Sequence, residues 1–273
     1  MAGLTGKTIS TSYKSLLRVD NDADGVGSTQ LDITDGEGTK TCLKVCDDFL
    51  RIEPQDDNTV GTLTVRNNSG SMILAVDTSN NVVKVNSGQE IANTQYAYFG
   101  IGGAGITSSN TAGYHYPLAF GGSIGVGSGA ALFDQLSIFG NATDPATSVT
   151  TADATDQRAS SLIGYMMYVP DNIYIDAVLS IEGADAATGD TTRFHLMSYT
   201  FNSGSTSCLT SGAVVAYSDP TTNAGSEQVY KSTWNINSDN ASVTGGKVLI
   251  CTFESDSVNS DFAYQAIIKY HLV

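Results

Sequence analysis

A short triplet that recurs through the first ninety residues constrains this chain more than any other feature. The triplet has the form Leu-x-Val or Leu-x-Ile, and the middle residue is polar or charged in every copy but one. Copies begin at Leu17, Leu31, Leu43, Leu50, Leu63 and Leu74, and Val83-Lys84-Val85 is a close relative. Alternation with a period of two residues is typical of a β-strand that buries one face.

Turn-forming residues separate these copies, in the stretches "DGEG", "PQDDN", "NNSG" and "DTSNN". Asp, Asn and Gly favour Asx turns and glycine turns, so residues 13–86 are expected to form about seven short strands. A sheet of very short strands is thin and cannot bury its apolar stripe alone. We therefore interpret residues 1–95 as a short-strand repeat region that other copies of the chain cover, as a trimeric stem or base.

The middle segment, residues 96–157, has a different character. It contains no Lys or Arg, and ten glycines lie between Gly100 and Gly129, interleaved with aromatic residues. Flexible linkers lack aromatic residues, so an irregular but closely packed backbone is expected here. The stretch "GAALFDQLSIFG" at 129–140 is the best helix candidate of the chain, and the small polar residues 141–157 are expected to form a surface loop or a linker.

From residue 158 to residue 273 the strand pattern returns with longer strands. The candidates are Leu162–Val169, Ile173–Glu182, Arg193–Phe201, Gly212–Tyr217, Gln228–Ile236, Lys247–Glu254 and Phe262–Leu272. Turns such as "PDN", "SDP" and "TGG" separate them, which favours a β-sandwich of the jelly-roll-like kind. The fold class predicted for the whole chain is all-β.

The stretch "VDNDADGVG" is the candidate cation site. Asp20, Asp22, Asp24 and Gly25 match the first half of a calcium loop of the EF-hand type. That loop needs a bidentate Glu at its twelfth position, where this chain has Leu31, which cannot ligate. Two interpretations stay open: a solvated turn between strands, or a turn that holds Ca²⁺ for stability.

Motifs for nucleotide binding and catalysis are weak. Gly100-Ile101-Gly102-Gly103-Ala104-Gly105 fits G-x-G-x-x-G, but no helical pattern follows it, and the pyrophosphate of a dinucleotide needs a helix N-terminus there. His115, His195 and His271 are isolated in the sequence, and no H-E-x-x-H motif occurs. We therefore assign no catalytic and no cofactor-binding residue, and we do not expect an enzyme.

The charge of the chain narrows its partners. The formal net charge is −15, and acidic residues exceed basic ones in all three segments. Such a chain repels phosphate backbones and anionic lipids, so neither nucleic acid nor a membrane surface is an expected partner. No apolar run approaches the roughly 18 residues of a membrane helix. A protein surface or a glycan fits an acidic chain better.

The four cysteines indicate a reducing environment. Cys42 and Cys46, placed in one strand, would lie roughly 13 Å apart at about 3.3 Å per residue, too far for a disulfide. Cys208 and Cys251 are isolated, and no C-x-x-C pair indicates zinc. The N-terminal stretch lacks the apolar core of a signal peptide. We expect four free thiols and folding in a cytoplasm.

Several stretches together resemble a known group of proteins. They are "GKTISTSYKSLLRV", "DGEGTKTCLKVCDDFLRIEPQ", "VDTSNNVVKVNSG", "YVPDNIYIDAVLSIEGADAATGDTTRFHLMSY" and "AIIKYHL". This texture resembles bacteriophage virion structural proteins, mainly of marine phages, of the tail-fibre or capsid-decoration type. The resemblance implies a non-catalytic homotrimer that is assembled in the host cytoplasm, becomes part of the virion and contacts capsid or tail proteins. It leaves capsid decoration and a fibre role as alternatives.

Two other classes compete with this interpretation. Strands rich in Tyr and an acidic surface also suit a carbohydrate-binding module, either a receptor-recognition module for host surface glycans or an adhesin. An enzyme such as a fibre-borne depolymerase is the weakest alternative, because histidine is sparse and the acidic residues cluster in turns rather than in pairs.

Overall fold

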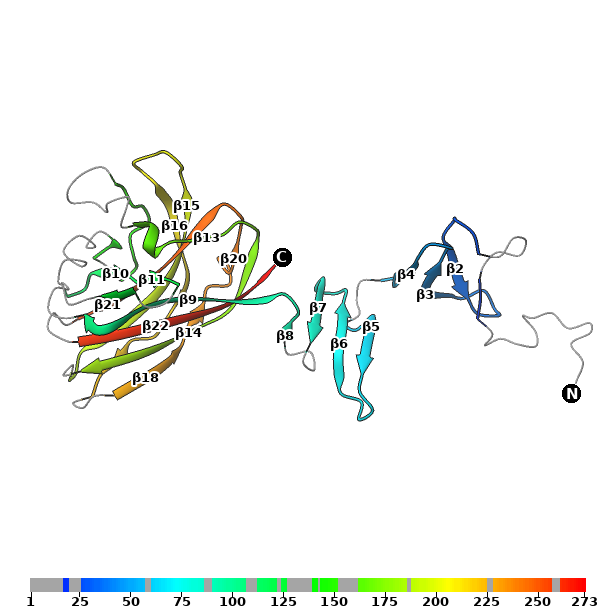
Figure 1. Cartoon of the computed structure of the whole chain (residues 1–273), viewed down its shortest axis with the longest axis horizontal. Coiled ribbons are helices and arrows are strands. Elements are labelled where there is room, and N and C mark those ends of the chain that lie inside the picture. The colour runs from blue at the N-terminus through cyan, green and yellow to red at the C-terminus, as the bar shows by residue number, and fades with distance from the viewer. Residues whose placement is uncertain are drawn as a thin grey trace, which may run out of the picture. The chain divides into compact units, whose positions relative to one another are not determined.

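The computed structural model describes residues 17–19, 26–56, 60–85, 90–106, 112–121, 124–126, 139–141, 143–151, 162–185, 188–224, 228–256 and 261–273. The chain divides into two compact units, Met1–Ala92 and Asn93–Val273, called unit 1 and unit 2 below. Apart from the 3-10 turn η4 (Ile163–Tyr165), the regular elements of the described part are strands, which confirms the all-β prediction (Figure 1).

Unit 1 contains two four-stranded antiparallel sheets, each formed by strands in chain order. The first consists of β1 (Arg18–Val19), β2 (Leu31–Thr34), β3 (Lys40–Val45) and β4 (Leu50–Ile52). Leu31, Val45 and Leu50 lie in register across it and share one face. On the other face Lys44 lies 2.6 Å from a carboxylate oxygen of Glu53. One face of this sheet is therefore apolar and the other is charged.

The second sheet of unit 1 repeats this division. It consists of β5 (Leu63–Arg66), β6 (Met72–Asp77), β7 (Val82–Val85) and β8 (Glu90–Ile91). Its register pairs Val76 of β6 with Leu63 on one side and Val83 on the other, and Leu74 with Val65 and Val85 in the same way. These six side chains share one face, which we call the apolar stripe. The stripe consists of the outer residues of three triplets, as a period of two requires.

The turn between β6 and β7 shows how a polar residue fixes this sheet. The buried carboxylate of Asp77 accepts hydrogen bonds from the backbone N and the Nδ2 of Asn80, at 3.0 and 2.8 Å. Lys84 Nζ lies 2.6 Å from the same carboxylate. The bonds from Lys84 and Asn80 lower the pKa of Asp77 to about 2. Asn81 adopts a positive φ of 56°, which Asn tolerates better than most residues.

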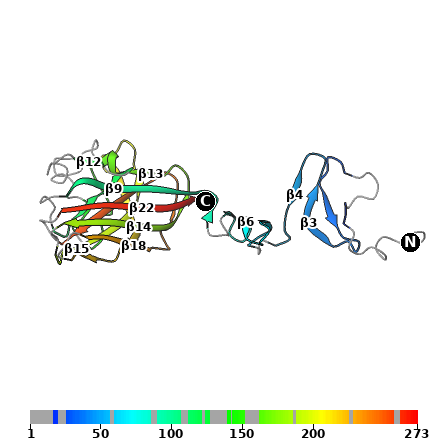
Figure 2. The same ribbon diagram turned by 60° about the horizontal axis from the view of Figure 1, so that its bottom comes forward.

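Unit 2 contains two seven-stranded sheets. The first, called the β15 sheet, has the order β10 (His115–Pro117), β21 (Lys247–Ser255), β15 (Thr191–Phe201), β16 (Leu209–Tyr217) and β19 (Asn235–Ile236), with β13 (Met167–Tyr168) on β21 and β17 (Thr221–Thr222) on β15. The second, called the β14 sheet, has the order β11 (Ala119–Phe120), β9 (Thr94–Ile106), β22 (Asp261–Leu272), β14 (Ile173–Asp185) and β18 (Gln228–Thr233), with β12 (Ile124–Val126) on β9 and β20 (Ser242–Val243) on β14. Figure 2 looks onto β9, β22, β14 and β18.

The main core of unit 2 combines residues of both sheets in one buried cluster. Phe194 and Phe253 of the β15 sheet meet Tyr264 of the β14 sheet, with ring centroids 5.0 and 4.6 Å apart. Trp234 stacks on Phe194 at 5.6 Å, and its indole Nε1 donates to Ser180 Oγ at 2.9 Å. Two sheets that share a core in this way form a sandwich-like unit.

The Gly-rich segment differs from the expectation. Instead of an irregular backbone, residues 94–106 form the single strand β9, paired with β22. Gly100 suits this place because a Cβ there would lie 2.7 Å from the carbonyl oxygen of Tyr264. The segment 96–157 was expected to be separate, but its described strands belong to unit 2, whose boundary lies between residues 92 and 93.

The strand expected at Leu162–Val169 is wrong in its first half, because η4 occupies Ile163–Tyr165 and only Met167–Tyr168 pairs with β21. Most of the helix candidate lies outside the described residues, since only Phe139 and Gly140 of 129–140 are described.

The outer face of the β15 sheet is covered by residues 139–141 and 143–151, which we call the cover segment. The second buried cluster comprises Phe139, Val149, Leu162, Met197, Tyr199, Cys208, Leu209, Val248 and Ile250. Tyr199 donates its hydroxyl to the carbonyl of Ala146 at 2.8 Å, and the N–H of Gly212 donates to the carbonyl of Thr147 at 2.7 Å. The described part of the expected surface loop 141–157 is thus packed against the sheet.

Candidate functional site

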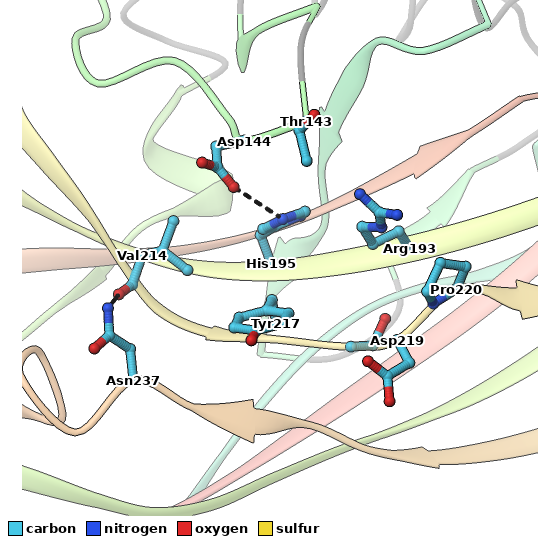
Figure 3. Close-up of a pocket in the computed structure, with 10 residues that line it drawn as sticks. Thr143, Asp144, Arg193, His195, Val214, Tyr217, Asp219, Pro220 and Asn237 are labelled. Atoms are coloured by element: carbon cyan, nitrogen blue, oxygen red, sulfur yellow. Dashed lines mark hydrogen bonds and ion pairs between the residues drawn. The ribbon is translucent and has the colours of Figure 1, made fainter.

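A pocket of about 540 Å³ opens on the outer face of the β15 sheet, beside the cover segment. Thr143 and Asp144 of the cover segment form one side, Arg193, His195 and Tyr217 lie along the strands, and Asp219, Pro220 and Asn237 lie beyond (Figure 3). We call it the outer-face pocket. A smaller pocket of about 310 Å³ adjoins it, shares Thr143, Arg193 and Pro220 with it, and adds Glu254.

The alternation of side chains along β15 determines which of them face the core and which face the pocket. Phe194 and Leu196 point into the main core, while Met197 and Tyr199 belong to the cluster under the cover segment. Because side chains alternate between the two faces of a strand, Arg193 and His195 lie on the outer face. Both residues line the pocket.

His195 is buried in the wall of the pocket, with 2% of its surface exposed. Burial, with smaller contributions from His115 and Arg193, lowers the pKa of His195 to about 3, so the ring is neutral at pH 7. The ring of His115 approaches it edge-on, with centroids 5.0 Å apart. His195 Nε2 lies 3.7 Å from Asp144 Oδ1, too far for a hydrogen bond. Asp144 is solvent-exposed, so its carboxylate offsets little of the free-energy cost of burying a charged His195 ring.

Arg193 supplies the positive charge of the pocket. Its side chain is half-buried, and within the described part of the chain its guanidinium makes no hydrogen bond and no ion pair. Three carboxylates line the two adjoining pockets, from Asp144, Asp219 and Glu254. Asp219 Oδ1 accepts a hydrogen bond from Asn235 Nδ2 at 3.2 Å. With His195 neutral, the formal charge of this region is negative.

The other groups of the pocket offer contacts rather than an activated nucleophile. Ser218 Oγ is buried and accepts the N–H of Phe194 at 3.0 Å, so it serves the sheet. The ring of Tyr217 is 42% exposed and lies nearly parallel to the His195 ring, 6.4 Å away. The arrangement provides an aromatic surface, hydrogen-bond donors and carboxylate acceptors around one cavity.

The structure brings together only some of the residues that the sequence singled out. His115 and His195 meet on the outer face, whereas His271 lies on β22, with Nδ1 3.0 Å from both carboxylate oxygens of Asp176. The calcium candidates Asp20, Asp22 and Asp24 lie outside the described residues, so their role stays open.

Sequence reasoning did not single out Arg193, Asp144 or Tyr217. The only signal was the alternation of "TTRFHLMSYTF", which puts positions 193 and 195 on one face.

All four cysteines are free thiols, as expected. Within the described ranges, no three His, Cys, Asp or Glu side chains gather as metal ligands. The same ranges contain no helix long and apolar enough to span a membrane.

Comparisons with known proteins add little. No protein-family model matches the chain, and no curated protein matches it. Among solved structures, a chain of the T13 IBDV viral particle aligns at 9% identity over 66% of this chain, with a TM-score of 0.11. This chain spans 58% of the length of that chain. A likeness at this TM-score carries no argument about fold or function.

Proposed function

We propose that this chain is a non-catalytic structural protein of a bacteriophage particle, and that its copies associate as a homotrimer through unit 1. One observation carries the association. Among the described residues of unit 1, the only buried apolar residues are Cys46 and Ala75, whereas unit 2 has a main core and a second buried cluster. Unit 1 therefore needs a partner surface to bury its apolar residues.

The unburied apolar residues of unit 1 are large. Leu50 is 59% exposed in the first sheet, and Val65 of the apolar stripe is 47% exposed. Full burial of such a side chain contributes about 1.5–3 kcal/mol, so several of them supply a strong drive for association. The opposite faces already have their own pairs, such as Lys44 with Glu53 and Lys84 with Asp77. Ile73 on the opposite face of the second sheet is also exposed, but the apolar stripe is the larger uncovered group.

The sequence resemblance favours other copies of the chain as that cover, and the uncharged stripe is where like-charged copies can meet. Two chains that each carry a net charge of −15 repel one another over most of their surface. The six side chains of the apolar stripe carry no charge, so copies can approach there, as in interface centres that are depleted of charged residues. The proposal of three copies, and of a phage particle as their location, rests on the resemblance of this sequence to bacteriophage fibre and decoration proteins.

Light scattering behind a sizing column tests the association. We expect the full chain to elute with a mass near three times 28.5 kDa. Val65→Lys puts a charge into the apolar stripe and should lower the mass to that of one chain. Thr64→Lys is the matched control, because Thr64 lies on the opposite face, beside Ala75, and this variant should stay trimeric.

A wild-type mass of one chain would contradict the trimer and would mean that the stripes find cover within the chain. An unchanged mass for Val65→Lys would exclude the stripe as the interface. Repeating the run with a chelator tests the two interpretations of Asp20, Asp22 and Asp24, since a bound cation that stabilises unit 1 would make the mass sensitive to chelation.

Purified virus particles that carry this gene test the virion role. Peptide mass spectrometry should detect the chain as a component of the particle. A copy number close to that of the capsid protein would indicate decoration, and a low copy number would indicate a fibre. The absence of the chain from purified particles would overturn the proposal.

A further inference from the structure

We propose that the outer-face pocket is a binding site for a neutral saccharide, with a sugar ring against Tyr217 and its hydroxyl groups on Arg193 and Asp219. This inference concerns unit 2 alone and does not depend on how copies of unit 1 associate.

The dimensions of the pocket fit a small polar ligand. Its volume of about 540 Å³ lies within the range of roughly 300–1,000 Å³ that is usual for ligand sites. The adjoining pocket of about 310 Å³ continues past Arg193, so the site is elongated and has room beyond a single ring. Its sides come from both the strands and the cover segment (Figure 3).

The charges select a neutral ligand with hydroxyl groups. The guanidinium of Arg193 makes no hydrogen bond and no ion pair with a described residue, so its donors are available to a ligand in the pocket. An anionic ligand would offer that acceptor but would also face the carboxylates of Asp144, Asp219 and Glu254. A hydroxyl group both accepts and donates, so one ligand with several hydroxyl groups satisfies the guanidinium and the carboxylates together.

His195 adds a second unsatisfied group. Its Nδ1 is buried and has no hydrogen-bond partner among the described residues, and the side chain is 98% shielded from solvent. Because the ring is neutral at pH 7, it presents no charge that would attract an anion. A buried polar atom without a partner costs free energy, so a ligand or an ordered water that reaches this ring is favoured.

Tyr217 provides the apolar part of the site. Its ring is 42% exposed and lies nearly parallel to the His195 ring, with centroids 6.4 Å apart. The C–H faces of a sugar ring are apolar while its rim carries hydroxyl groups. An aromatic ring surrounded by Arg193, Asp219 and Asp144 presents the complementary pattern.

Saturation-transfer NMR on the full chain at pH 7 tests the site. The probes are the methyl glycosides of glucose, galactose, mannose and N-acetylglucosamine, with N-acetylneuraminic acid and inorganic phosphate as anionic probes. We expect transfer to at least one neutral glycoside. Tyr217→Ala should weaken its affinity about tenfold or more, and Asp219→Asn should weaken it by a smaller factor.

Tyr168→Ala is the matched control, because Tyr168 is also an exposed tyrosine of the β15 sheet but does not line the pocket. The control should bind like the wild type. The melting temperature of each variant checks folding, and Asp219→Asn decides the result where Tyr217→Ala does not fold, since it keeps the side-chain shape.

Three results would overturn the proposal: no transfer to any probe, binding of the anionic probes alone, or neutral binding that neither variant changes. None of these results depends on the solution mass of the protein, which is measured separately. A failure here is therefore distinct from a failure of the trimer.

Discussion

The two units of this chain use the same alternation of apolar and polar residues, but they differ in what they bury. Strands in unit 1 have two to six residues, and no side chain on the apolar face of either sheet is fully buried. The central strands of unit 2 have nine to thirteen residues and pack in two sheets around a shared core. Alternation determines which face is apolar, but only a second layer can bury that face.

Strand β15 extends this comparison. Six consecutive residues, Phe194 to Tyr199, are buried, because the core lies on one side of the strand and the cover segment on the other. The triplet strands of unit 1 have no such cover within the described residues. Burial of both faces therefore marks a strand that is enclosed by its own chain.

The largest expected effect comes from removing a core ring of unit 2. Phe253 is fully buried between Tyr116 and Tyr264, so Phe253→Ala should lower the free energy of unfolding by about 3–5 kcal/mol. Urea unfolding followed by the fluorescence of Trp234, the only tryptophan, measures this loss. Val83→Ala in the apolar stripe is the control and should leave the Trp234 transition within about 0.5 kcal/mol. Equal shifts for both variants would contradict the separation of the two units.

A smaller effect is expected from acid, through His195. In the unfolded chain its pKa is about 6.5, while in the folded chain it is about 3. The unfolded state therefore binds the extra proton between these values, and the free energy of unfolding falls as the pH drops, by at most about 1.4 kcal/mol per pH unit. The stabilising contribution of the neutral His195 ring is fully present above about pH 6.5.

Urea unfolding of the wild type and of His195→Gln at pH 7, 6 and 5 checks this prediction. The variant should lose less stability than the wild type across this range. Glu182, whose pKa burial raises, has the opposite sign, but it is present in both proteins and cancels in the difference. Identical slopes would mean that His195 does not titrate as its burial requires.

The smallest expected effect on the sandwich-like unit comes from Asp77 in unit 1. Asp77→Asn removes the charge that Lys84 contacts, and we expect faster amide hydrogen exchange across β6 and β7. The Trp234 transition should not move. In the wild type, the low pKa of Asp77 stabilises unit 1 above about pH 4, and this contribution is lost as the pH falls toward 2. A shift of the Trp234 transition would show that the two units unfold together.

The strands were the most predictable part of the molecule. The triplets of unit 1 and most of the long candidates of unit 2 lie in strands, because strict alternation and turn residues are local signals. Strand β9 was missed, since its Gly-rich sequence carries no alternation. Its pairing with β22, and the narrow space beside Tyr264 at Gly100, are long-range features that a local pattern does not contain.

The outer-face pocket was not predictable in the same way. Its lining comes from the cover segment, β15, the end of β16 and the residues after β19, which are separated in the sequence. The segment around Asp144 was predicted to be a surface loop because its residues are small and polar. Phe139 and Val149, which anchor this segment to the β15 sheet, are apolar residues without a regular period.

The sequence by itself determined that this protein is all-β, with short strands first and long strands later, and which face of each strand is apolar. These properties depend on neighbouring residues, whose side chains alternate along an extended backbone. Only the tertiary structure decided that two sheets of unit 2 share a core, that the cover segment encloses the outer face of one of them, and that Arg193, His195 and Tyr217 surround a cavity. Those outcomes depend on contacts between distant segments, whose free energy no single stretch of sequence displays.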